Sequence, residues 1–399
     1  MDTDTGKIVI ILGILLVISA VILLVYKNNS EKFSDGTITH PGFMVSKTRL
    51  EKIKYNVNNK IEPHYTAFNN LIKSPYADLN YIPKGPPSDG YIRCGSYERP
   101  NIGCSHESVD SAAAVIQAVL WIITENRRYA ENSINIMNRY SKVYKGHKLS
   151  NSILQASWTM EKFPVAAEII RYSNAGWKDD DFDRFKNMLN KYVSEIRVKN
   201  SSNGNWMLSK IHGLIGISIV TANTRLYKWC VKKLIKAIPA YVYHESDGRR
   251  PEKTGGISTN WNGQRVFNKY SSGVSQETCR DLGHTQMGLS SMFGALEACY
   301  IQGDDLYGRF EKRLVETVEL HSRLMNKEIN KNICNGKRLA STNWTFPTFE
   351  IAYNALSNRM GNKMPATMNY IENRVRKLTY DKFDNRYHHN TILETLLTV

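Results

Sequence analysis

Apolar residues recur at helical spacing along most of this chain, and this pattern limits the possible folds more than any other feature of its sequence. Within residues 109–124, for example, Val115, Val119 and Ile123 fall on one face of a helix. Signals for β-strands are sparse. The pattern therefore predicts an all-α domain of helices joined by loops, although periodicity alone does not distinguish one helical array from another. Helices are predicted over residues 109–124, 127–141, 207–220, 226–242 and 306–327.

The composition indicates a globular protein with an anionic partner. The chain has 399 residues, 42% of them hydrophobic, which allows either two domains or one large helical domain with a substantial core. Its formal net charge of +16 favours nucleic acid, anionic lipid headgroups or an acidic glycan as the partner. The sequence lacks zinc-finger spacing, RNA-recognition motifs and dense basic runs, so we expect no nucleic acid partner.

The N-terminal region contains an almost unbroken apolar run over residues 8–26. At about nineteen residues, this run is long enough to cross a hydrocarbon core. A cleaved signal peptide is the alternative, but the run is long for one and no small-x-small cleavage site closes it. We therefore expect a tail (1–7), an uncleaved single-pass membrane anchor (8–26), a polar linker (27–39) and a globular domain (40–399). Flanking charges do not settle the orientation of the anchor.

One polar stretch, residues 276–289, looks suited to chemistry. It reads QETCRDLGHTQMGL and leads directly into an apolar helical segment. Part of this polarity is expected at any helix N-terminus, where Asp281 or Thr278 could serve as the cap. Arg280 and His284, however, are four residues apart, so on a helix they share one face and can address the same ligand.

This stretch resembles the alginate lyase superfamily, whose members cleave uronic-acid polysaccharides. The resemblance extends over nearly the whole chain after residue 40, and it implies an α/α toroid, an acidic polysaccharide as substrate and no cofactor. Further segments resemble the family in the same order: His40 to Ser46, Cys94-Gly95, Asn101 to Cys104, Asn151 to Gln155, Phe163 to Arg171, Asn203 to Trp206, Gln302 to Tyr307 and Pro347 to Asn354.

Cleavage of a uronate by β-elimination has three chemical requirements. The carboxylate must be neutralised so that the C5 proton becomes acidic, a base must take that proton, and an acid must protonate the departing oxygen. In the family, an Asn/His pair on an earlier loop, an arginine and a tyrosine do this work. By resemblance, Arg280 lies at the arginine position, and Asn203 and Asn205 lie in the loop that carries the asparagine.

Two positions depart from the family pattern. The loop histidine is absent, since the nearest histidine, His212, lies further along and is interpreted as helix surface. The expected tyrosine is Met287, which can neither take nor give a proton. We therefore predict that His284 handles the proton, because its side chain titrates near neutral pH, while Arg280 and Asn205 neutralise the carboxylate. Tyr270 is a weaker candidate for the proton.

Several other residues are candidates for binding the sugar. Trp206 and Trp261 could stack on sugar rings, although core packing explains either equally well. Hydrogen bonds to sugar hydroxyls or a place in the cleft are predicted for Asn151, Gln155, Asn203, Gln264, Gln276 and Gln286. For Asn151 and Gln155 the alternative is a buried amide bonded to the backbone. No motif for a metal or cofactor is present, and none is expected.

The six cysteines bear on the compartment of the protein. Cys94 and Cys104 resemble a short disulfide loop of secreted family members, and Cys279 with Cys334 is a candidate second pair. Cys230 and Cys299 lie in apolar helical contexts and are interpreted as core thiols. The alternative is that all six are reduced and buried. Disulfides would place the globular domain in a luminal or extracellular compartment.

Three classes of function follow. The first is a membrane-anchored polysaccharide lyase acting on a uronic-acid glycan such as alginate or glucuronan. The second is a catalytically inactive glycan-binding or structural surface protein that uses the same cleft, which the departure at Met287 favours. The third is a membrane-surface protein whose positive charge binds anionic lipid, and this binding would vanish with added salt.

Overall fold

Most of the regular secondary structure is helical, as the periodicity predicts. The computed structural model describes residues 37–197, 202–254, 256–328, 332–334, 339, 347–378 and 388–399. The predicted anchor at residues 8–26 and most of the predicted linker lie outside these residues. Residues Ile38–Val399 form one compact unit.

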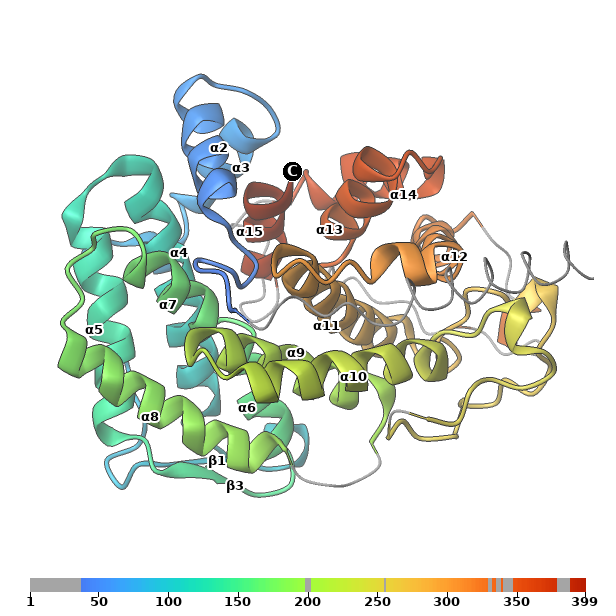
Figure 1. Cartoon of the computed structure of the whole chain (residues 1–399), viewed down its shortest axis with the longest axis horizontal. Helices are drawn as coiled ribbons and strands as arrows, with labels where there is room; N and C mark the ends of the chain where they lie inside the picture. Colours follow the sequence, from blue (N-terminus) through green and yellow to red (C-terminus); the bar gives the residue numbers. More distant parts are fainter. Residues whose placement is uncertain are drawn as a thin grey trace, which may run out of the picture. The chain divides into compact units, whose positions relative to one another are not determined.

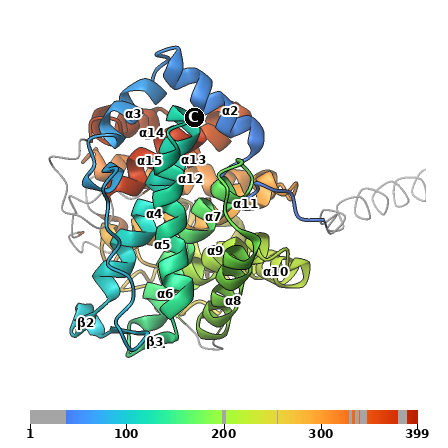
Figure 2. The same cartoon turned by 90° about the vertical axis from the view of Figure 1, so that its left-hand side faces the viewer.

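Some helices follow one another closely along the chain, whereas long segments precede α4, α11 and α13 (Figures 1 and 2). They are α2 (Lys47–Asn58), α3 (His64–Leu71), α4 (Cys104–Thr124), α5 (Arg127–Val143), α6 (Ser152–Met160), α7 (Phe163–Arg171), α8 (Asp179–Ile196), α9 (Gly204–Val220), α10 (Thr224–Tyr241), α11 (Leu282–Ile301), α12 (Tyr307–Met325), α13 (Phe349–Tyr353), α14 (Pro365–Tyr370) and α15 (His388–Thr398). Single π-helical segments, Asn354–Arg359 and Ile371–Val375, continue α13 and α14.

These helices divide into buried and half-buried ones. Nearly every described residue of α9 and α11 is buried, as is most of α4, so these helices form the interior. In contrast, α5, α8, α10 and α12 bury one stripe each and turn a charged face outward. In α5, for instance, Tyr129, Ser133, Ile136 and Tyr140 form the buried stripe.

Close packing around α9 holds the interior together. This helix packs against α6, α10 and α11, and α10 lies beside it in Figure 1. Glycines permit its close approach to α6: a Cβ at Gly213 would lie 3.0 Å from Met160 Cβ, and one at Gly216 would lie 3.0 Å from Met160 O. Buried helices covered by amphipathic ones fit the predicted α/α toroid.

The predicted helices are confirmed, but several begin earlier than the periodicity indicates. The helix predicted at 109–124 starts at Cys104. Periodicity missed its first turn because that turn carries Glu107, which is polar but fully buried. The helix predicted at 207–220 starts at Gly204. Asp281, one of the two proposed caps, does cap α11, whereas Thr278 lies before the helix. Hydrophobic periodicity does not detect a helical turn whose inward residue is charged.

A small sheet, which the sparse strand signals did not identify, lies beside the start of α4. Its order is β2 (Asn101–Ile102), β1 (Tyr91–Cys94), β3 (Gly146–Lys148); β1 pairs antiparallel with β2 and parallel with β3.

Both predicted disulfides are present. Cys94–Cys104 joins β1 to the first residue of α4, and Cys279–Cys334 joins the segment before α11 to a residue beyond α12. Cys230 and Cys299 are buried free thiols, as predicted. The alternative of six reduced cysteines is therefore wrong.

Among the described residues, only α4 is long and apolar enough to cross a membrane, and 72% of its apolar window is buried inside the protein. A helix buried to that extent by its neighbours is a core helix.

Candidate active site

The first turns of α9 and α11 lie side by side. Gln276 and Glu277, in the segment that leads into α11, hold them together. Gln276 Oε1 accepts a hydrogen bond from the backbone N–H of Gly204 at 3.0 Å. Glu277 Oε2 accepts one from the N–H of Asn205 at 2.9 Å. The segment that leads into α11 thus caps α9, because the first N–H groups of a helix lack partners within it. Two positive helix ends therefore meet at one place.

Asp281 positions His284 in the first turn of α11. Its Oδ1 accepts a hydrogen bond from the backbone N–H of His284 at 2.8 Å, and its Oδ2 lies 2.7 Å from His284 Nδ1. Burial would raise the pKa of Asp281, but hydrogen bonds and charge from His284, with the charge of Arg280, hold that pKa below its usual value. An ionised Asp281 fixes the imidazole so that Nδ1 carries the proton, which leaves Nε2 available.

Glu277 plays the same part for Arg280. The guanidinium Nη1 of Arg280 lies 3.2 Å from Glu277 Oε1, and its Nε lies 3.9 Å from Asp281 Oδ2. Burial raises the pKa of Glu277 to about 7, against the opposing effects of the Asn205 N–H and the charges of His284 and Arg280. Glu277 itself is fully buried, whereas about a third of the Arg280 and His284 side chains is exposed. The two groups that can meet a ligand are thus oriented by two carboxylates that support them from within.

Tyr241, the last residue of α10, closes the floor of this site. Its ring lies so close to Gly204 that a Cβ there would approach within 2.0 Å, and its hydroxyl would lie 2.1 Å from a Cβ on Gly288. The hydroxyl donates to the carbonyl of Thr285 at 3.2 Å. Burial, with the nearby charge of Glu277, raises the pKa of Tyr241 well above its usual value, so the phenol stays protonated. Both glycines are needed for the close approach of this ring.

The predicted catalytic residues are therefore brought together. Arg280 lies just before α11 and His284 lies in its first turn, so the two do not share a helix face as predicted, but both approach Asp281. Asn205 lies at the start of α9 beside Glu277. Asn205 is buried, and its side-chain oxygen accepts a hydrogen bond from the Trp206 N–H at 2.7 Å. Asn203 is half-buried at the cap of α9, and its side chain makes no hydrogen bond within the described part of the chain. It is the loop amide best placed to meet a ligand.

Some predicted sugar-binding residues do lie at this end of the interior. The contacts of Gly213 with Ser157 and of Gly216 with Met160 show that α6 and α9 run parallel. Asn151, at the start of α6, therefore lies at the same end as Asn205. Asn151 and Trp206 are both half-buried, and their roles stay predictions.

Other predicted sugar-binding residues are buried and hydrogen-bonded within the protein, which favours a structural role for them, and their binding of sugar stays a prediction. Each side chain is buried and bonded to protein groups: Gln155 to Glu107 at 2.9 Å, Gln264 to the carbonyl of Val266 at 2.7 Å, Gln276 to Gly204 and Asn260, and Gln286 to the carbonyl of Leu282 at 3.3 Å. An inward amide satisfies backbone groups that would otherwise be unpaired.

Three residues discussed in the sequence analysis, and Glu350 within the matching segment Pro347 to Asn354, have other surroundings. Trp261 is buried edge-on against Phe267, which favours the alternative of core packing, and its stacking on sugar stays a prediction. His212 lies in the interior with 6% of its surface exposed, not on a helix surface, because α9 is buried all round. Glu350 pairs with Arg376 at 2.7 Å. Tyr270 is 80% exposed.

Sequence reasoning missed Glu277 as a functional residue. The available signal was its spacing, since an acid three residues before Arg280 lies within reach of it.

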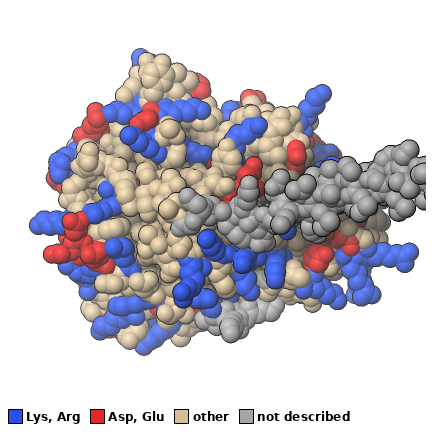
Figure 3. Space-filling view, in the orientation of Figure 1, with Lys and Arg blue, Asp and Glu red and all other residues tan. Residues whose placement is uncertain are grey.

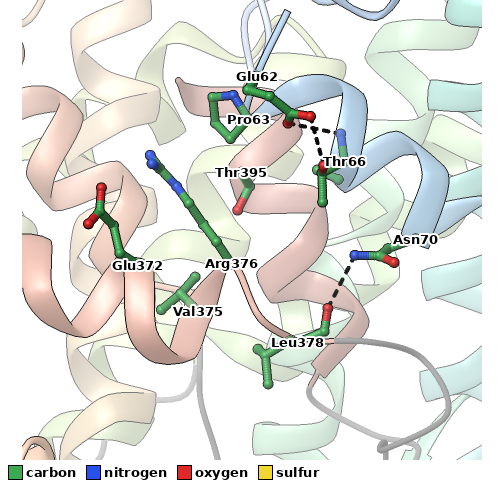
Figure 4. Close-up of a pocket in the computed structure, with 10 residues that line it drawn as sticks. Glu62, Pro63, Thr66, Asn70, Glu372, Val375, Arg376, Leu378 and Thr395 are labelled. Carbon is green, nitrogen blue, oxygen red and sulfur yellow. Dashed lines mark hydrogen bonds between the residues drawn. The ribbon is translucent and has the colours of Figure 1, made fainter. Parts of the chain in front are cut away.

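Two cavities lie apart from this site. One, of about 370 Å³, opens at the surface and is lined by residues around α3, α15 and the π-helical segment after α14 (Figure 4). Two of its charged groups are engaged: Arg376 pairs with Glu350, and Glu62 accepts from Thr66. The other, of about 90 Å³, is lined by His212 and Gly294 among others. No cluster of three or more metal-ligating side chains occurs in the described ranges.

Comparisons with known proteins assign the chain to a family. The family model described as "Alginate lyase" matches residues 72–328, more than half of the chain. No curated protein matches.

Solved structures match over nearly the whole length. Alginate lyase A1-III from Sphingomonas species A1 is 13% identical with a TM-score of 0.59, covering 93% of this chain and 99% of that one. A histidine-to-alanine variant of the same enzyme, complexed with a tetrasaccharide, is 13% identical with a TM-score of 0.59, covering 84% and 92%. An alginate lyase from Bacteroides ovatus is 12% identical with a TM-score of 0.59, covering 89% and 99%. At these identities the structures show a shared fold, and the family match shows that this chain belongs to the alginate lyase family.

Proposed function

We propose that this protein is a polysaccharide lyase that cleaves a uronic-acid glycan, such as alginate or glucuronan, by β-elimination. The observation that carries the proposal is the pairing of Arg280 with His284. Both are partly exposed at the meeting point of two helix N-termini, and each is oriented by a carboxylate beneath it. A cation beside a titratable base is what the acidification and removal of a proton next to a carboxylate require.

Arg280 would bind the substrate carboxylate. Its planar guanidinium offers several N–H donors in a fixed geometry, and Glu277 holds one of its nitrogens at 3.2 Å. Asn203, at the cap of α9, would add a neutral donor. The positive ends of α9 and α11 favour negative charge at the same place. Negative charge builds on the carboxylate as the C5 proton leaves, so these groups stabilise the transition state more than the ground state.

His284 would transfer the proton. Its Nε2 takes the C5 proton, the C5 electron pair forms the C4–C5 double bond, and the bond between C4 and the glycosidic oxygen breaks. The imidazolium then returns the proton to the departing oxygen, which becomes a hydroxyl. Asp281 stabilises the imidazolium through its contact with Nδ1 at 2.7 Å. This assignment compensates for Met287, which cannot act as an acid or a base.

The products provide the test. The full-length protein is mixed with alginate, polyglucuronate and other polyuronates, and the ultraviolet absorbance of the unsaturated uronate is followed. Mass spectrometry checks that the chain ends lack the water that a hydrolase would add. We expect a rise in absorbance with one class of polymer. We expect no rise with His284→Ala and an unchanged rise with His106→Ala, which removes an exposed histidine of α4.

A second candidate is a glycan-binding surface protein without catalysis. Met287 at the expected tyrosine position and the absence of a histidine between Asn203 and Trp206 favour it. Retention of the folded protein on a polyuronate gel, with no unsaturated product from any polymer, would support this function over the lyase.

For the N-terminus we propose a single-pass membrane anchor over residues 8–26, with the globular domain luminal or extracellular. Two disulfides in that domain support an oxidising compartment. Alkaline carbonate extraction tests the anchor, since an anchored protein stays with the membrane pellet. Protease treatment of sealed vesicles tests its orientation.

A further inference from the structure

The outward face of α10 carries a row of basic side chains. Arg225, Lys232 and Lys236 are exposed and Lys228 is half-exposed, and the helix contains no Asp or Glu. Spacings of three and four residues place these four on one ridge, which extends about 16 Å along the helix. Figure 3 shows Lys and Arg side chains gathered over α10. We call these four residues the basic strip.

The basic strip differs from the other outward faces. On α12, Lys312 and Glu316 are one turn apart, and on α8 three aspartates precede Arg184 and Lys186. Those helices mix charges of opposite sign, as solvated faces usually do. In the basic strip, Lys228, Lys232 and Lys236 follow one another at single-turn spacing, and like charges at that spacing repel. Such a row lowers the stability of its own helix, so helix stability does not account for it.

The basic strip ends beside the active site. Because α9 and α10 are antiparallel, Tyr241 at the end of α10 contacts Gly204 at the start of α9. Thr254 Oγ1 donates to the carbonyl of Lys236 at 2.9 Å, which holds the following loop against the end of the basic strip. That loop carries the exposed cations Arg249, Arg250 and Lys253, together with the exposed acids Glu245 and Glu252.

The same loop reaches the cap of α9. Ser202 donates its N–H to the carbonyl of Gly256 at 3.1 Å and accepts from the N–H of Ser258 at 2.7 Å. Ser202 directly precedes Asn203, so this loop joins the end of the basic strip to the entrance of the site.

We propose that the basic strip is an extended binding surface for a long acidic polysaccharide, which holds uronate residues beyond those in the active site and directs the chain toward Arg280. This inference rests on the proposed function and adds a preference for long chains. A ridge of cations one helix wide matches a linear polymer with regularly spaced carboxylates, and such a field raises the local concentration of an anionic substrate.

The chemistry of α10 favours a glycan over a membrane surface. A helix that lies in a lipid interface pairs its basic residues with exposed aromatic and aliphatic ones. In α10, Leu226, Tyr227, Val231 and Leu234 are buried in the protein. Trp229, which is half-buried, lies under the cations of Arg197 and Lys233 at 4.7 and 5.5 Å. The exposed face therefore offers charge without apolar side chains to insert.

The test compares two full-length variants with equal loss of charge. One replaces the basic strip: Arg225→Gln, Lys228→Gln, Lys232→Gln and Lys236→Gln. The control replaces four exposed lysines around α2 and α3: Lys47→Gln, Lys52→Gln, Lys60→Gln and Lys73→Gln. Each protein is assayed on long polyuronate and on its trimer. Binding to the long polymer is measured separately by retention on a polyuronate gel, which needs no turnover.

We expect KM for the long polymer to be about tenfold higher in the strip variant than in the wild type, and retention of the variant on the gel to weaken by a similar factor. Tenfold is the lower end of the effect that charge focusing has on local substrate concentration. The kcat of the strip variant and its KM for the trimer should stay unchanged, and the control should match the wild type. The inference is overturned if both variants lose affinity for the long polymer equally, or if neither variant loses affinity. It is also overturned if KM for the trimer rises as much as KM for the polymer.

The gel separates this inference from the proposed function. Strip-dependent retention without any turnover would support the binding surface and reject the lyase. Strip-dependent binding to phosphatidylserine vesicles, with no retention on polyuronate, would overturn the glycan assignment in favour of lipid.

Discussion

At the scale of single residues, two carboxylates orient the candidate catalytic groups: Glu277, which is fully buried, and Asp281, which is partly exposed. Glu277 and Asp281 lie beneath Arg280 and His284, and each holds its partner by a direct contact. Their environments differ: burial raises the pKa of Glu277 to about 7, whereas contacts with His284 keep Asp281 ionised. Perturbed titration of this kind is typical of functional sites.

Replacing Glu277 by Gln tests two effects of this residue separately: its effect on the pH dependence of unfolding and its effect on the rate of cleavage. Its pKa is raised from 4.5 in the unfolded chain to about 7, so the stability that comes from protonation is present below 4.5 and is lost as the pH rises through about 7. The wild type should lose roughly 3 kcal/mol over this window at most, since each pKa unit corresponds to about 1.4 kcal/mol. Urea unfolding at acidic and alkaline pH should show this loss in the wild type and not in Glu277→Gln.

The same variant should cleave polymer more slowly, because a neutral amide orients Arg280 less firmly. An identical pH dependence of unfolding in the variant and the wild type would contradict the raised pKa of Glu277.

A second buried cluster affects stability at higher pH. His147 lies 3.0 Å from Glu107 and 2.8 Å from Glu195. Burial would lower its pKa, but these two carboxylates raise it to about 9 from the usual 6.5. The resulting stability is fully present below 6.5 and is lost as the pH rises through about 9. His147→Gln should unfold with about 3–5 kcal/mol less free energy near neutral pH, because it leaves Glu107 buried without its cation.

Denaturation of that variant should also lack the alkaline loss of stability. A fall above pH 7 of the same size in His147→Gln would show that another group is responsible.

At the scale of elements, the candidate site depends on the first turns of α9 and α11, which hold each other in position. The segment before α11 caps α9 through Gln276 and Glu277, so neither helix can shift alone. The disulfide Cys279–Cys334 ties this segment to a residue beyond α12. The position of Arg280, next to Cys279, therefore depends on this cross-link.

Removing each disulfide should have different effects on activity. The variant with Cys279→Ser and Cys334→Ser opens a cross-link with a sequence separation of 55, which should cost about 2–4 kcal/mol of unfolding free energy and lower kcat. The matched control, Cys94→Ser with Cys104→Ser, opens a separation of 10 in a different part of the domain. It should lose stability while keeping kcat. Equal kcat values in the two variants would show that the second disulfide does not position the site.

The sequence was most informative for elements that are half-buried or uniformly apolar. Its periodicity predicted α5, α10 and α12 because one face of each helix is buried. It could not show that Gln155, Gln264, Gln276 and Gln286 turn inward, because an amide suits a buried backbone partner as well as a sugar hydroxyl. His212 was misplaced for a related reason, since periodicity does not reveal that α9 has no exposed face.

At the scale of the whole molecule, contacts between distant parts of the chain hold the interior in place. Glu297 of α11 accepts from Arg49 of α2 at 2.6 Å, from Arg359 near the end of the π-helical segment at 2.8 Å, and from the Tyr307 hydroxyl at 3.0 Å. Such long-range pairings lie outside the reach of local sequence patterns. The resemblance to a known family implied the toroid, but none of these three contacts was predicted.

The net charge of +16 is also a property of the whole molecule. Added salt screens charges that are exposed to solvent. We expect KM for a long polyuronate to rise with ionic strength, while kcat changes little, because Arg280 and His284 lie in a partly buried site. Initial rates over a range of sodium chloride concentrations measure both values. A constant KM would contradict a role for the positive surface in substrate binding.

The most direct test of catalysis by His284 is rescue of His284→Ala with imidazole. Removing the group that transfers the proton should lower the rate of unsaturated product formation by about a hundredfold to ten-thousandfold, without unfolding the domain. Added imidazole should restore part of that rate, and it should do nothing for Arg280→Ala. Wild-type turnover by His284→Ala on its own would contradict the assignment of His284 as the group that moves the proton.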